Sequence, residues 1–270
     1  MKNWTGERLE TFVNNKNTID HLHRYAVAGN FITDKIVLDI ACGEGYGTNL
    51  MSLTARFVYG VDIDNVTIKK ANLKYKKANI EFKQGNAAAI PMPDSSVDVI
   101  VSYETIEHHD HHEEMMSEIK RVLKQDGVLI ISTPDKLNYS DKRNYNNQFH
   151  VKELYKNEFS LLVSQKFRKI QMLNQKFVNG NSIIQPDEEI NIDVYTGNYF
   201  QIELNRVDAL YLVIIASDID FKDQLISIFD GSRVLEADLD QKISKVYNSK
   251  SYKIGNFLIR PYRILRKIVK

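Results

Sequence analysis

Acidic and histidine side chains between residues 104 and 150 form the group best suited to chemistry. Glu104, Glu107 and His108 are spaced i, i+3, i+4, which places them on one side of a helical turn. Two carboxylates and an imidazole that face one cleft are an unusual way to build a core, and they match the donors that divalent metals bind. A fourth donor must come from elsewhere in the chain, and His150 is the candidate.

This group allows two kinds of chemistry. In the first, a single Mg²⁺, Mn²⁺ or Zn²⁺ ion binds the substrate that accepts the transferred group. The ion is held by four side chains: Glu104, Glu107, His108 and His150. In the second, the residues lie beside the substrate without a metal, and His108 or His150, with Glu107 close by, takes a proton from the acceptor. The run HHDHH also fits a solvated loop, so the roles of its remaining histidines stay open: His109, His111 and His112.

A strand and a glycine loop upstream form a platform for a ligand. The stretch KIVLDIACGEGYGTN begins with an apolar run of strand length, interrupted by Asp39, and continues to Gly43, Gly45 and Gly47. Glycines are needed where a backbone turns sharply and passes close to a ligand, because a Cβ would collide with it. The helix that follows would point its first N–H groups at that ligand.

The spacing of this loop narrows the choice of ligand. A dinucleotide loop of the G-x-G-x-x-G type would need a small residue where the chain has Thr48. The pattern D-x-A-C-G-x-G-x-G instead resembles motif I of the class I methyltransferases that depend on S-adenosyl-L-methionine (SAM). The resemblance implies that SAM binds here and that S-adenosyl-L-homocysteine is the product. It also implies that the backbone from Ala41 to Gly45 passes under the methionine part, with Asp39 near its amino group.

Five residues that come later in the sequence than the glycine loop complete the expected cofactor site. Asp62 ends the second strand, where the resemblance places a carboxylate that accepts both ribose hydroxyls, and Ile63 would pack on the adenine. Asn86 stands where this family usually has aspartate, so its amide oxygen would accept the adenine amino group without the help of a charge. Ala87 and Tyr103 are the remaining candidates for contact with the cofactor.

An amphipathic helix precedes the glycine loop. The segment TIDHLHRYAVAGNFI carries apolar residues at helical spacing, and helices at this place fold over bound SAM in the family that the chain resembles. Arg24 or Tyr25 would then contact the SAM carboxylate. The alternative is a helix that only packs on the edge of the sheet.

The order of strands and helices predicts the fold. Apolar runs of strand length alternate with helical segments, which favours an α/β protein with a doubly wound, mostly parallel, Rossmann-like sheet of seven strands. Asp64 is expected to cap the helix 65–76. The expected strands are 36–40, 57–63, 80–84, 96–102, 128–132, 170–177 and 209–216.

The chain divides into three expected parts. Residues 1–33 form N-terminal cap helices, and residues 34–218 form the methyltransferase domain. Within that domain, segments inserted at 135–150 and 179–205 would choose the acceptor, and their tyrosines suit stacking on a sugar or another ring. Residues 219–270 form a C-terminal helical appendage.

The last segment of this appendage has an unusual charge pattern. Residues 250–270 hold seven basic residues and no acid, while Leu258, Leu265 and Ile268 recur at helical spacing on the other side. This pattern is typical of a helix that lies on an anionic membrane surface, with Pro261 in its first turn. A basic helix that packs on its own domain or on a partner subunit is the alternative.

Composition limits the compartment and the partners. Lys and Arg total 36 against 35 Asp and Glu, and this near-neutral balance argues against nucleic acid as a partner. The single cysteine, Cys42, has no internal disulfide partner, which favours a reducing cytosol. No apolar run approaches the ~20 residues of a membrane span, and the N-terminus lacks the apolar core of a signal peptide. We therefore expect a cytoplasmic protein with peripheral contact to the inner membrane face, of undetermined oligomeric state.

Resemblance also suggests the acceptor. The elements ACGEGYG, ETIEH, STP and HVKEL resemble methyltransferases among the enzymes that build bacterial surface polysaccharides, which implies O-methylation of a sugar hydroxyl in a small-molecule or glycan acceptor. The set E-x-x-E-H with a distant histidine resembles the metal site of small-RNA 3′-terminal 2′-O-methyltransferases and, in part, that of ubiquinone-pathway O-methyltransferases. An RNA 3′ end and a phenol or quinone-like acceptor are therefore rival substrates. The alternative to an enzyme is a non-catalytic scaffold protein that binds SAM.

Overall fold

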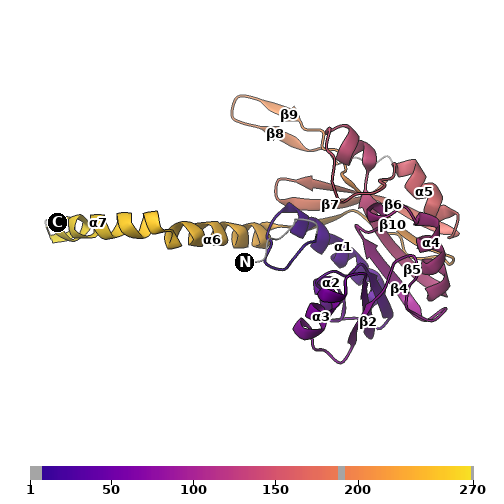
Figure 1. Ribbon diagram of the computed structural model, residues 1–270. Coiled ribbons are helices and arrows are strands. Elements are labelled where there is room, and N and C mark those ends of the chain that lie inside the picture. The colour runs from indigo at the N-terminus through magenta and orange to yellow at the C-terminus, as the bar shows by residue number, and fades with distance from the viewer. Residues whose placement is uncertain (1–7, 188–191, 269–270) are drawn as a thin grey trace.

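A sheet of nine strands with helices on both faces makes up the body of the protein (Figure 1). This computed structural model describes residues 8–187 and 192–268, without the side chains of 260–268. A two-stranded hairpin, β8 (Tyr195–Gly197) with β9 (Ile202–Leu204), projects from the body, and an arm of two helices, α6 (Ser232–Asn248) and α7 (Lys250–Ile268), extends away from it.

The first five strands are parallel and lie in the order β3-β2-β1-β4-β5, as predicted for a doubly wound sheet. The central strand β4 is buried along almost its whole length, which is typical of a parallel sheet that is covered on both faces. These strands are β1 (Ile36–Ile40), β2 (Phe57–Asp62), β3 (Ile80–Gln84), β4 (Val97–Tyr103) and β5 (Leu123–Pro134).

Helices and short turns connect the strands. Asp64 caps α3 as expected, because its side chain accepts the Val66 N–H at 2.9 Å. The first helix pairs a buried apolar face with a cap at Asn15, whose side chain accepts the Thr18 N–H. The helices are α1 (Lys16–Ile32), α2 (Tyr46–Met51), α3 (Asn65–Lys74), α4 (His112–Val122) and α5 (Lys156–Ser164), with the turns η1 (Ile106–His108) and η2 (Leu137–Asp141).

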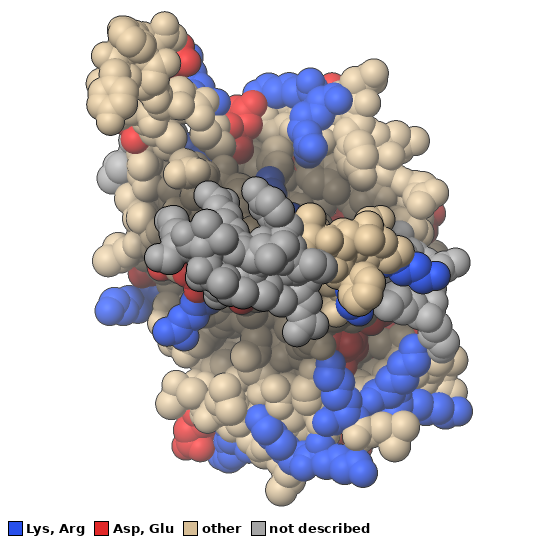
Figure 2. Space-filling view, turned by 90° about the vertical axis from the view of Figure 1, so that its left-hand side faces the viewer, with Lys and Arg blue, Asp and Glu red and all other residues tan. Residues whose placement is uncertain are grey.

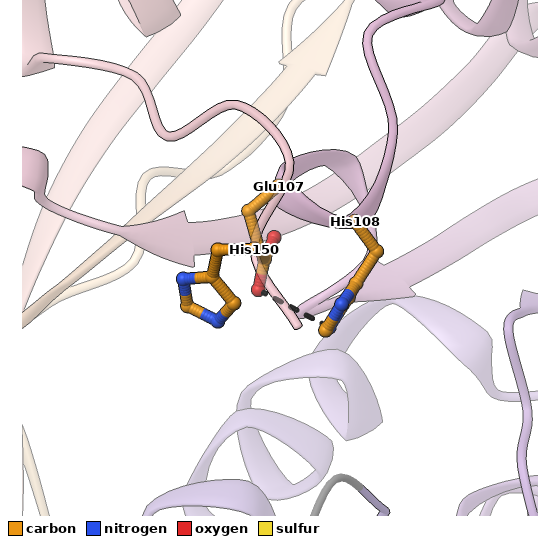
Figure 3. A group of neighbouring side chains, drawn as sticks. All are labelled: Glu107, His108 and His150. Carbon is orange, nitrogen blue, oxygen red and sulfur yellow. Dashed lines mark ion pairs between the residues drawn. The ribbon is translucent and has the colours of Figure 1, made fainter. Parts of the chain in front are cut away.

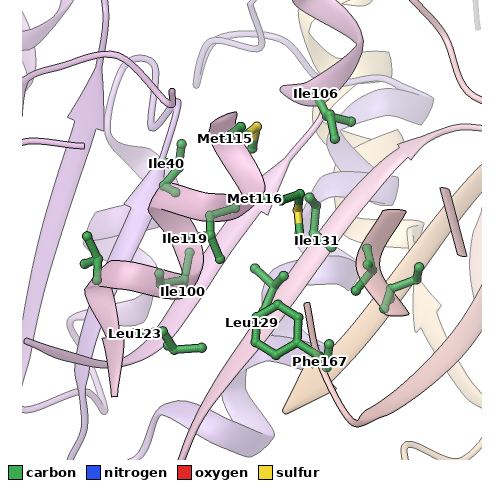
Figure 4. Close-up of a cluster of buried hydrophobic side chains, with 14 of the residues drawn as sticks. Ile40, Ile100, Ile106, Met115, Met116, Ile119, Leu123, Leu129, Ile131 and Phe167 are labelled. Atoms are coloured by element: carbon green, nitrogen blue, oxygen red, sulfur yellow. The ribbon is translucent and has the colours of Figure 1, made fainter. Parts of the chain in front are cut away.

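The larger core lies between the sheet and the helices α4 and α5 (Figure 4). Met115, Met116 and Ile119 of α4 are fully buried against Ile100 of β4 and Ile131 of β5. Burying a side chain of this size contributes about 1.5–3 kcal/mol. Because α4 is anchored in this way, the turn between β4 and α4, which carries the acidic and histidine group, is held at one place on the sheet edge.

The sheet has nine strands and not the expected seven. Its second half consists of β6 (Lys169–Val178), β7 (Asn181–Pro186), β10 (Tyr211–Ser217) and β11 (Ser227–Asp230). β7 turns back from β6 through Asn179 and Gly180, which have positive φ values of 45° and 86°. An Asn-Gly pair is a strong hairpin signal, although an insertion is expected there. β11 pairs with β7, so the sheet continues beyond residue 218.

The C-terminal arm contributes no side chain of α6 to the core. Within α6, whose residues are all described, no side chain is buried. α7 runs from Lys250 to Ile268, so position 261 lies inside the helix and not in its first turn. A proline inside a helix removes one backbone hydrogen bond at a cost of about 3 kcal/mol, and the helix nevertheless continues through this position. The basic residues expected from Arg260 onward lie outside the described side chains, and in the described parts of the chain no helix has both the length and the apolar character to cross a bilayer.

Candidate cofactor and acceptor site

A cavity of about 310 Å³ opens at the carboxyl ends of β1, β2 and β4, with α1 on its other side. This is the edge at which open α/β sheets bind ligands. Ten of the expected site residues line it: Tyr25, Ala41, Gly43, Asp62, Ile63, Asn86, Ala87, Tyr103, Glu104 and His108. Five others lie outside the lining: Arg24, Asp39, Gly45, Glu107 and His150.

The glycine loop leaves room for a ligand against its backbone. Ala41, Gly43 and Gly45 have positive φ values of 57°, 54° and 88°, the left-handed conformation that favours glycine. A Cβ at Gly45 would come within 2.7 Å of the Phe82 ring, so that position accepts no side chain. A Cβ at Gly43 would meet no atom within 4 Å, which means that this residue borders the open cavity.

Asp39 lies behind the loop. Its side chain is 1% exposed, and Oδ2 accepts a hydrogen bond of 2.6 Å from the Thr48 hydroxyl. Burial raises the pKa of Asp39 to about 7; the Thr48 bond opposes this rise and the nearby Asp62 carboxylate adds to it. The charge of Asp39 near neutral pH therefore depends on its surroundings, including any cation on the other side of the loop.

Asp62 connects the end of β2 to the loop. Its Oδ2 accepts the Gly43 N–H at 3.0 Å, and its Oδ1 accepts the Asp64 N–H at 2.9 Å. Arg8 approaches the same Oδ1 at 3.3 Å and pairs with Asp64 at 2.9 Å. Arg8 also lines the cavity, together with Leu9. No pattern in the sequence points to Arg8, because a single arginine outside any periodic segment has no preferred place.

The helix α1 brings Tyr25 to the cavity and buries Arg24 behind it. Arg24 Nη1 lies 2.8 Å from Glu104 Oε1, and Arg24 Nε donates to Gln175 at 2.6 Å. The Arg24 carbonyl accepts the Tyr103 hydroxyl at 2.8 Å. Of the two residues expected at the SAM carboxylate, only Tyr25 faces the cavity, and Arg24 anchors α1 to the sheet.

Two further residues of the cavity wall have no counterpart in the expected site. His21 Nδ1 lies 2.9 Å from the Tyr46 hydroxyl, and both residues line the cavity. Burial lowers the pKa of His21 well below its usual value, and the positive charge of Arg24 lowers it further. The spacing of His21 on α1 gives no sign of this contact, because its partner follows the glycine loop.

The segment from Glu104 to His108 does not form the single helical turn that the spacing predicts. Glu104 has a positive φ of 50°, and the 3₁₀ turn η1 begins two residues later. With this backbone, the Glu104 carboxylate lies against Arg24 and accepts the Ser132 hydroxyl at 2.7 Å. Glu104 is therefore not part of the group whose ligand atoms lie together, although its charge still acts on Glu107.

Glu107 is fully buried beside His108. Its Oε2 accepts a hydrogen bond of 3.3 Å from Thr133, whereas its Oε1 has no hydrogen-bond partner among the residues that the structure describes. Burial raises the pKa of Glu107 well above its usual value, and the neighbouring Glu104 adds to the effect. A bound proton or a cation would satisfy such a buried oxygen.

His108 is held in one tautomer at the edge of the cavity. Its Nδ1 lies 2.9 Å from the Phe149 carbonyl oxygen, which only accepts, so Nδ1 carries a proton, and in the neutral ring Nε2 is then the acceptor. This Nε2 lies 4.0 Å from Glu107 Oε1. An imidazole with this arrangement can take a proton or bind a metal through Nε2.

His150 joins Glu107 and His108 from a distant segment (Figure 3). Each of the three offers a ligand atom, and these atoms lie within 4.8 Å of one another. His150 is engaged in the structure, because Nδ1 donates to Glu153 at 2.5 Å and Nε2 accepts from Asn147 at 2.9 Å. Two imidazoles and a carboxylate suit several divalent ions once His150 leaves one of these partners.

Sequence comparison finds methyltransferases among the proteins similar to this chain. Residues 38–131 match the protein family described as Methyltransferase domain. The chain is 39% identical over 128 residues to a probable S-adenosylmethionine-dependent methyltransferase of Mycolicibacterium smegmatis, over 47% of this chain and 49% of that protein. It is 26% identical over 137 residues to phthiotriol/phenolphthiotriol dimycocerosates methyltransferase 1 of Mycobacterium ulcerans, over 47% and 51%. The chain thus spans about half the length of these relatives.

Solved structures share the fold. The YcgJ protein of Bacillus subtilis matches with a TM-score of 0.53 and 21% identity, over 74% of this chain and 100% of that protein. A methyltransferase of Mesorhizobium loti matches with a TM-score of 0.53 and 11% identity, over 74% and 98%. The α/β sheet therefore has the fold of these methyltransferase structures, and residues 38–131, which include the glycine loop and Asp62, match a methyltransferase domain and are similar to SAM-dependent methyltransferases.

Proposed function

We propose that this protein transfers a methyl group from SAM to an acceptor hydroxyl, and that the hydroxyl belongs to a sugar. One observation carries the proposal: His108 lines the cofactor cavity with its Nδ1–H held by the Phe149 carbonyl, which in the neutral ring leaves Nε2 as the acceptor. An imidazole held in this tautomer is suited to remove a hydroxyl proton.

The residues around the cavity fit SAM. Gly43 leaves open space, Asp62 lies where the ribose hydroxyls are expected, and the exposed Ile63 offers an apolar face for adenine. The amide oxygen of Asn86 accepts the Ala88 N–H at 2.9 Å and keeps a second lone pair for a ligand. When bound, SAM supplies an activated methyl group on a positively charged sulfur.

The protein itself must remove the proton of the acceptor hydroxyl. A bond forms between the acceptor oxygen and the methyl carbon while the carbon–sulfur bond breaks, and the hydroxyl proton moves to His108 Nε2. The Phe149 carbonyl stabilises the resulting imidazolium through the Nδ1–H bond. A positioned base of this kind contributes about 10²–10⁴-fold to the rate.

A row of aromatic rings beside His108 supports a sugar as acceptor. The His108 and His150 rings lie 5.3 Å apart, Tyr139 stacks on His150 at 5.5 Å, and Tyr145 meets Tyr139 edge-on at 5.6 Å. Such rings combine apolar faces, which suit the C–H face of a sugar, with polar edges that can bind hydroxyls. The resemblance to polysaccharide methyltransferases favours the same acceptor class.

A metal-assisted form of the transfer is the second candidate. It is carried by the grouping of Glu107, His108 and His150, whose ligand atoms lie within 4.8 Å of one another. An ion there would bind the acceptor oxygen and favour loss of its proton. The two candidates exclude each other, because His108 Nε2 binds either the ion or the proton.

The acceptor is tested by incubating the purified protein with labelled SAM and separate panels of nucleotide sugars, lipid-linked glycans, phenols and short RNA. Label in a sugar hydroxyl is the expected result. Label found only in RNA or only in phenols would show that this rival compound is the acceptor and that a sugar is not. Binding of SAM without transfer to any panel would favour a scaffold.

The mechanism is tested with His108→Ala and a chelator. We expect activity to fall about 10²–10⁴-fold in the variant and to be unchanged in chelator. Loss of activity in chelator, with recovery when Mn²⁺ or Zn²⁺ is added, would favour the metal instead, and His150→Ala would then be as inactive as His108→Ala. Glu113→Gln, on the exposed first turn of α4, is the matched control.

A further inference from the structure

The helix α7 exposes a group of apolar side chains beside basic residues. Phe257 and Leu258 are 74% and 69% exposed, and Ile254 is largely exposed as well. Lys250 and Lys253 lie on the same helix and are also exposed. A contiguous group of exposed apolar side chains marks a site of contact with a partner or a membrane. In Figure 1 the arm points away from the body, so the domain itself does not cover α7.

Charge distinguishes α7 from α6, although the two helices form one arm. Residues 250–270 contain seven basic residues and no acid. In α6, three acids accompany three basic residues, and Lys242 pairs with Asp238 at 2.5 Å. The positive charge of the arm is therefore concentrated in α7, next to the exposed apolar residues.

Two other features project on the same side of the molecule. Tyr199 and Phe200, between β8 and β9, are fully exposed, and the hairpin that carries them leans to the side from which the arm extends (Figure 1). The helix α3 lies on that side too, and the segment 69–77 exposes five lysines. Figure 2 shows this side from the front, with Lys and Arg side chains gathered in its lower part.

We infer that α7 and the β8–β9 hairpin dock this protein on an anionic lipid surface. Phe257 and Leu258 would enter the boundary between headgroups and acyl chains, and the basic residues of α7 would contact lipid phosphates. Tyr199 and Phe200 give a second contact, because aromatic side chains favour the membrane interface. This surface lies outside the methyl-transfer site and does not depend on the reaction proposed above.

Other occupants fit the same surface less well. A second copy of α7 would bring six basic residues against six others without an acid on either side. Nucleic acid would neutralise the charge but leave Phe257 and Leu258 in water. An anionic membrane satisfies both the charge and the apolar side chains.

The inference is tested by co-sedimentation of the full chain with vesicles of phosphatidylcholine alone and of phosphatidylcholine with about 30% phosphatidylglycerol. We expect at least about tenfold tighter binding to the anionic vesicles, weakened by high salt. Equal binding to both vesicles, or no binding to the anionic ones, would overturn it. Binding of a short RNA that competes fully with the anionic vesicles would assign the surface to nucleic acid.

Paired variants locate the contact. Phe257→Ser combined with Leu258→Ser should reduce binding to anionic vesicles about tenfold or more, and Lys250→Glu with Lys253→Glu should do the same. Leu239→Ser, an exposed position of α6, is the control and should bind like the wild type. If the control is affected as strongly as the α7 variants, the assignment to α7 is wrong.

Two measurements separate this surface from the catalytic site and from self-association. Calorimetry with S-adenosylhomocysteine should give the same affinity for the Phe257→Ser/Leu258→Ser variant and the wild type, which shows that the variant is folded. Sedimentation velocity without lipid should give the same mass for both. A wild-type dimer that the variant breaks, with unchanged lipid binding, would show that a second copy covers this face.

Discussion

Replacing Asp39 by asparagine should stabilise the protein at neutral pH. Asp39 is 1% exposed, and burial raises its pKa from 3.8 to about 7. Between these two pH values, an unfolded chain has released the proton while the folded protein still holds it. The free energy of unfolding therefore falls as the pH rises through this window.

The size of the effect follows from the width of the window. About three pH units separate the two pKa values, and each unit is worth about 1.4 kcal/mol, so this carboxyl lowers the free energy of unfolding by about 4 kcal/mol between pH 4 and pH 8. Asparagine does not titrate, and its amide oxygen can still accept the Thr48 hydroxyl. We expect Asp39→Asn to exceed the wild type by about 2–4 kcal/mol at pH 8 and to match it near pH 4.

Urea unfolding of both proteins between pH 4 and pH 8 measures this difference. The buried histidines titrate in both proteins, so the comparison isolates Asp39. Asp98→Asn is a control of opposite sign: burial opposes the change, but Lys124 and the Ile36 N–H hold the pKa of Asp98 below its usual value, so this variant loses stability above pH 4. An Asp39→Asn difference that is the same at pH 4 and pH 8 would refute the reasoning. If Asp39 lies near the cofactor's amino group, as the resemblance to motif I implies, calorimetry should show that the same variant binds S-adenosylhomocysteine more weakly.

Four further variants test other parts of the site. Gly45→Ala should lower the free energy of unfolding by at least about 1–3 kcal/mol in urea, because its φ is +88° and a Cβ would meet Phe82. Asp62→Ala should weaken calorimetric binding of S-adenosylhomocysteine by roughly 2–4 kcal/mol through loss of charged hydrogen bonds. Glu107→Gln should stabilise the protein increasingly as pH rises above 4.5, since burial raises the pKa of Glu107, and the gain should vanish at low pH. Arg24→Met should lower the free energy of unfolding by about 3–5 kcal/mol, because it leaves Glu104 without its cation.

Features that depend on neighbours in the chain could be predicted from the sequence. The strands β1 to β4, the glycine loop and the cap at Asp64 follow from short patterns, and the structure agrees with them. The position of Asp62 at the cavity follows in the same way, because an acid at the end of the strand after the loop must lie at the ligand edge. In each case, the decisive residues are close together in the sequence.

Features that depend on distant segments could not be predicted. The spacing of Glu104, Glu107 and His108 predicts one helical face, but the positive φ of Glu104 turns its carboxylate to Arg24 instead. Arg24 and Glu104 are 80 residues apart in the sequence, and no local pattern predicts that they pair. The strand β11 is similar, because its four residues form a strand only by pairing with β7.

The two arginines near the cavity show which part of the chain can open to admit a ligand. Arg24 is 1% exposed and holds α1 to Glu104, Gln175 and the Tyr103 hydroxyl, so moving α1 would break a buried ion pair at a cost of about 3–5 kcal/mol. Arg8 is 35% exposed and contacts Asp62 at 3.3 Å and Asp64 at 2.9 Å, so its guanidinium stays partly in water, unlike that of Arg24. We therefore expect the Arg8 side chain to leave its partners more readily than α1 leaves the sheet. The ribose hydroxyls expected at Asp62 would replace the guanidinium there, so entry of the cofactor and release of Arg8 become one exchange while α1 stays in place.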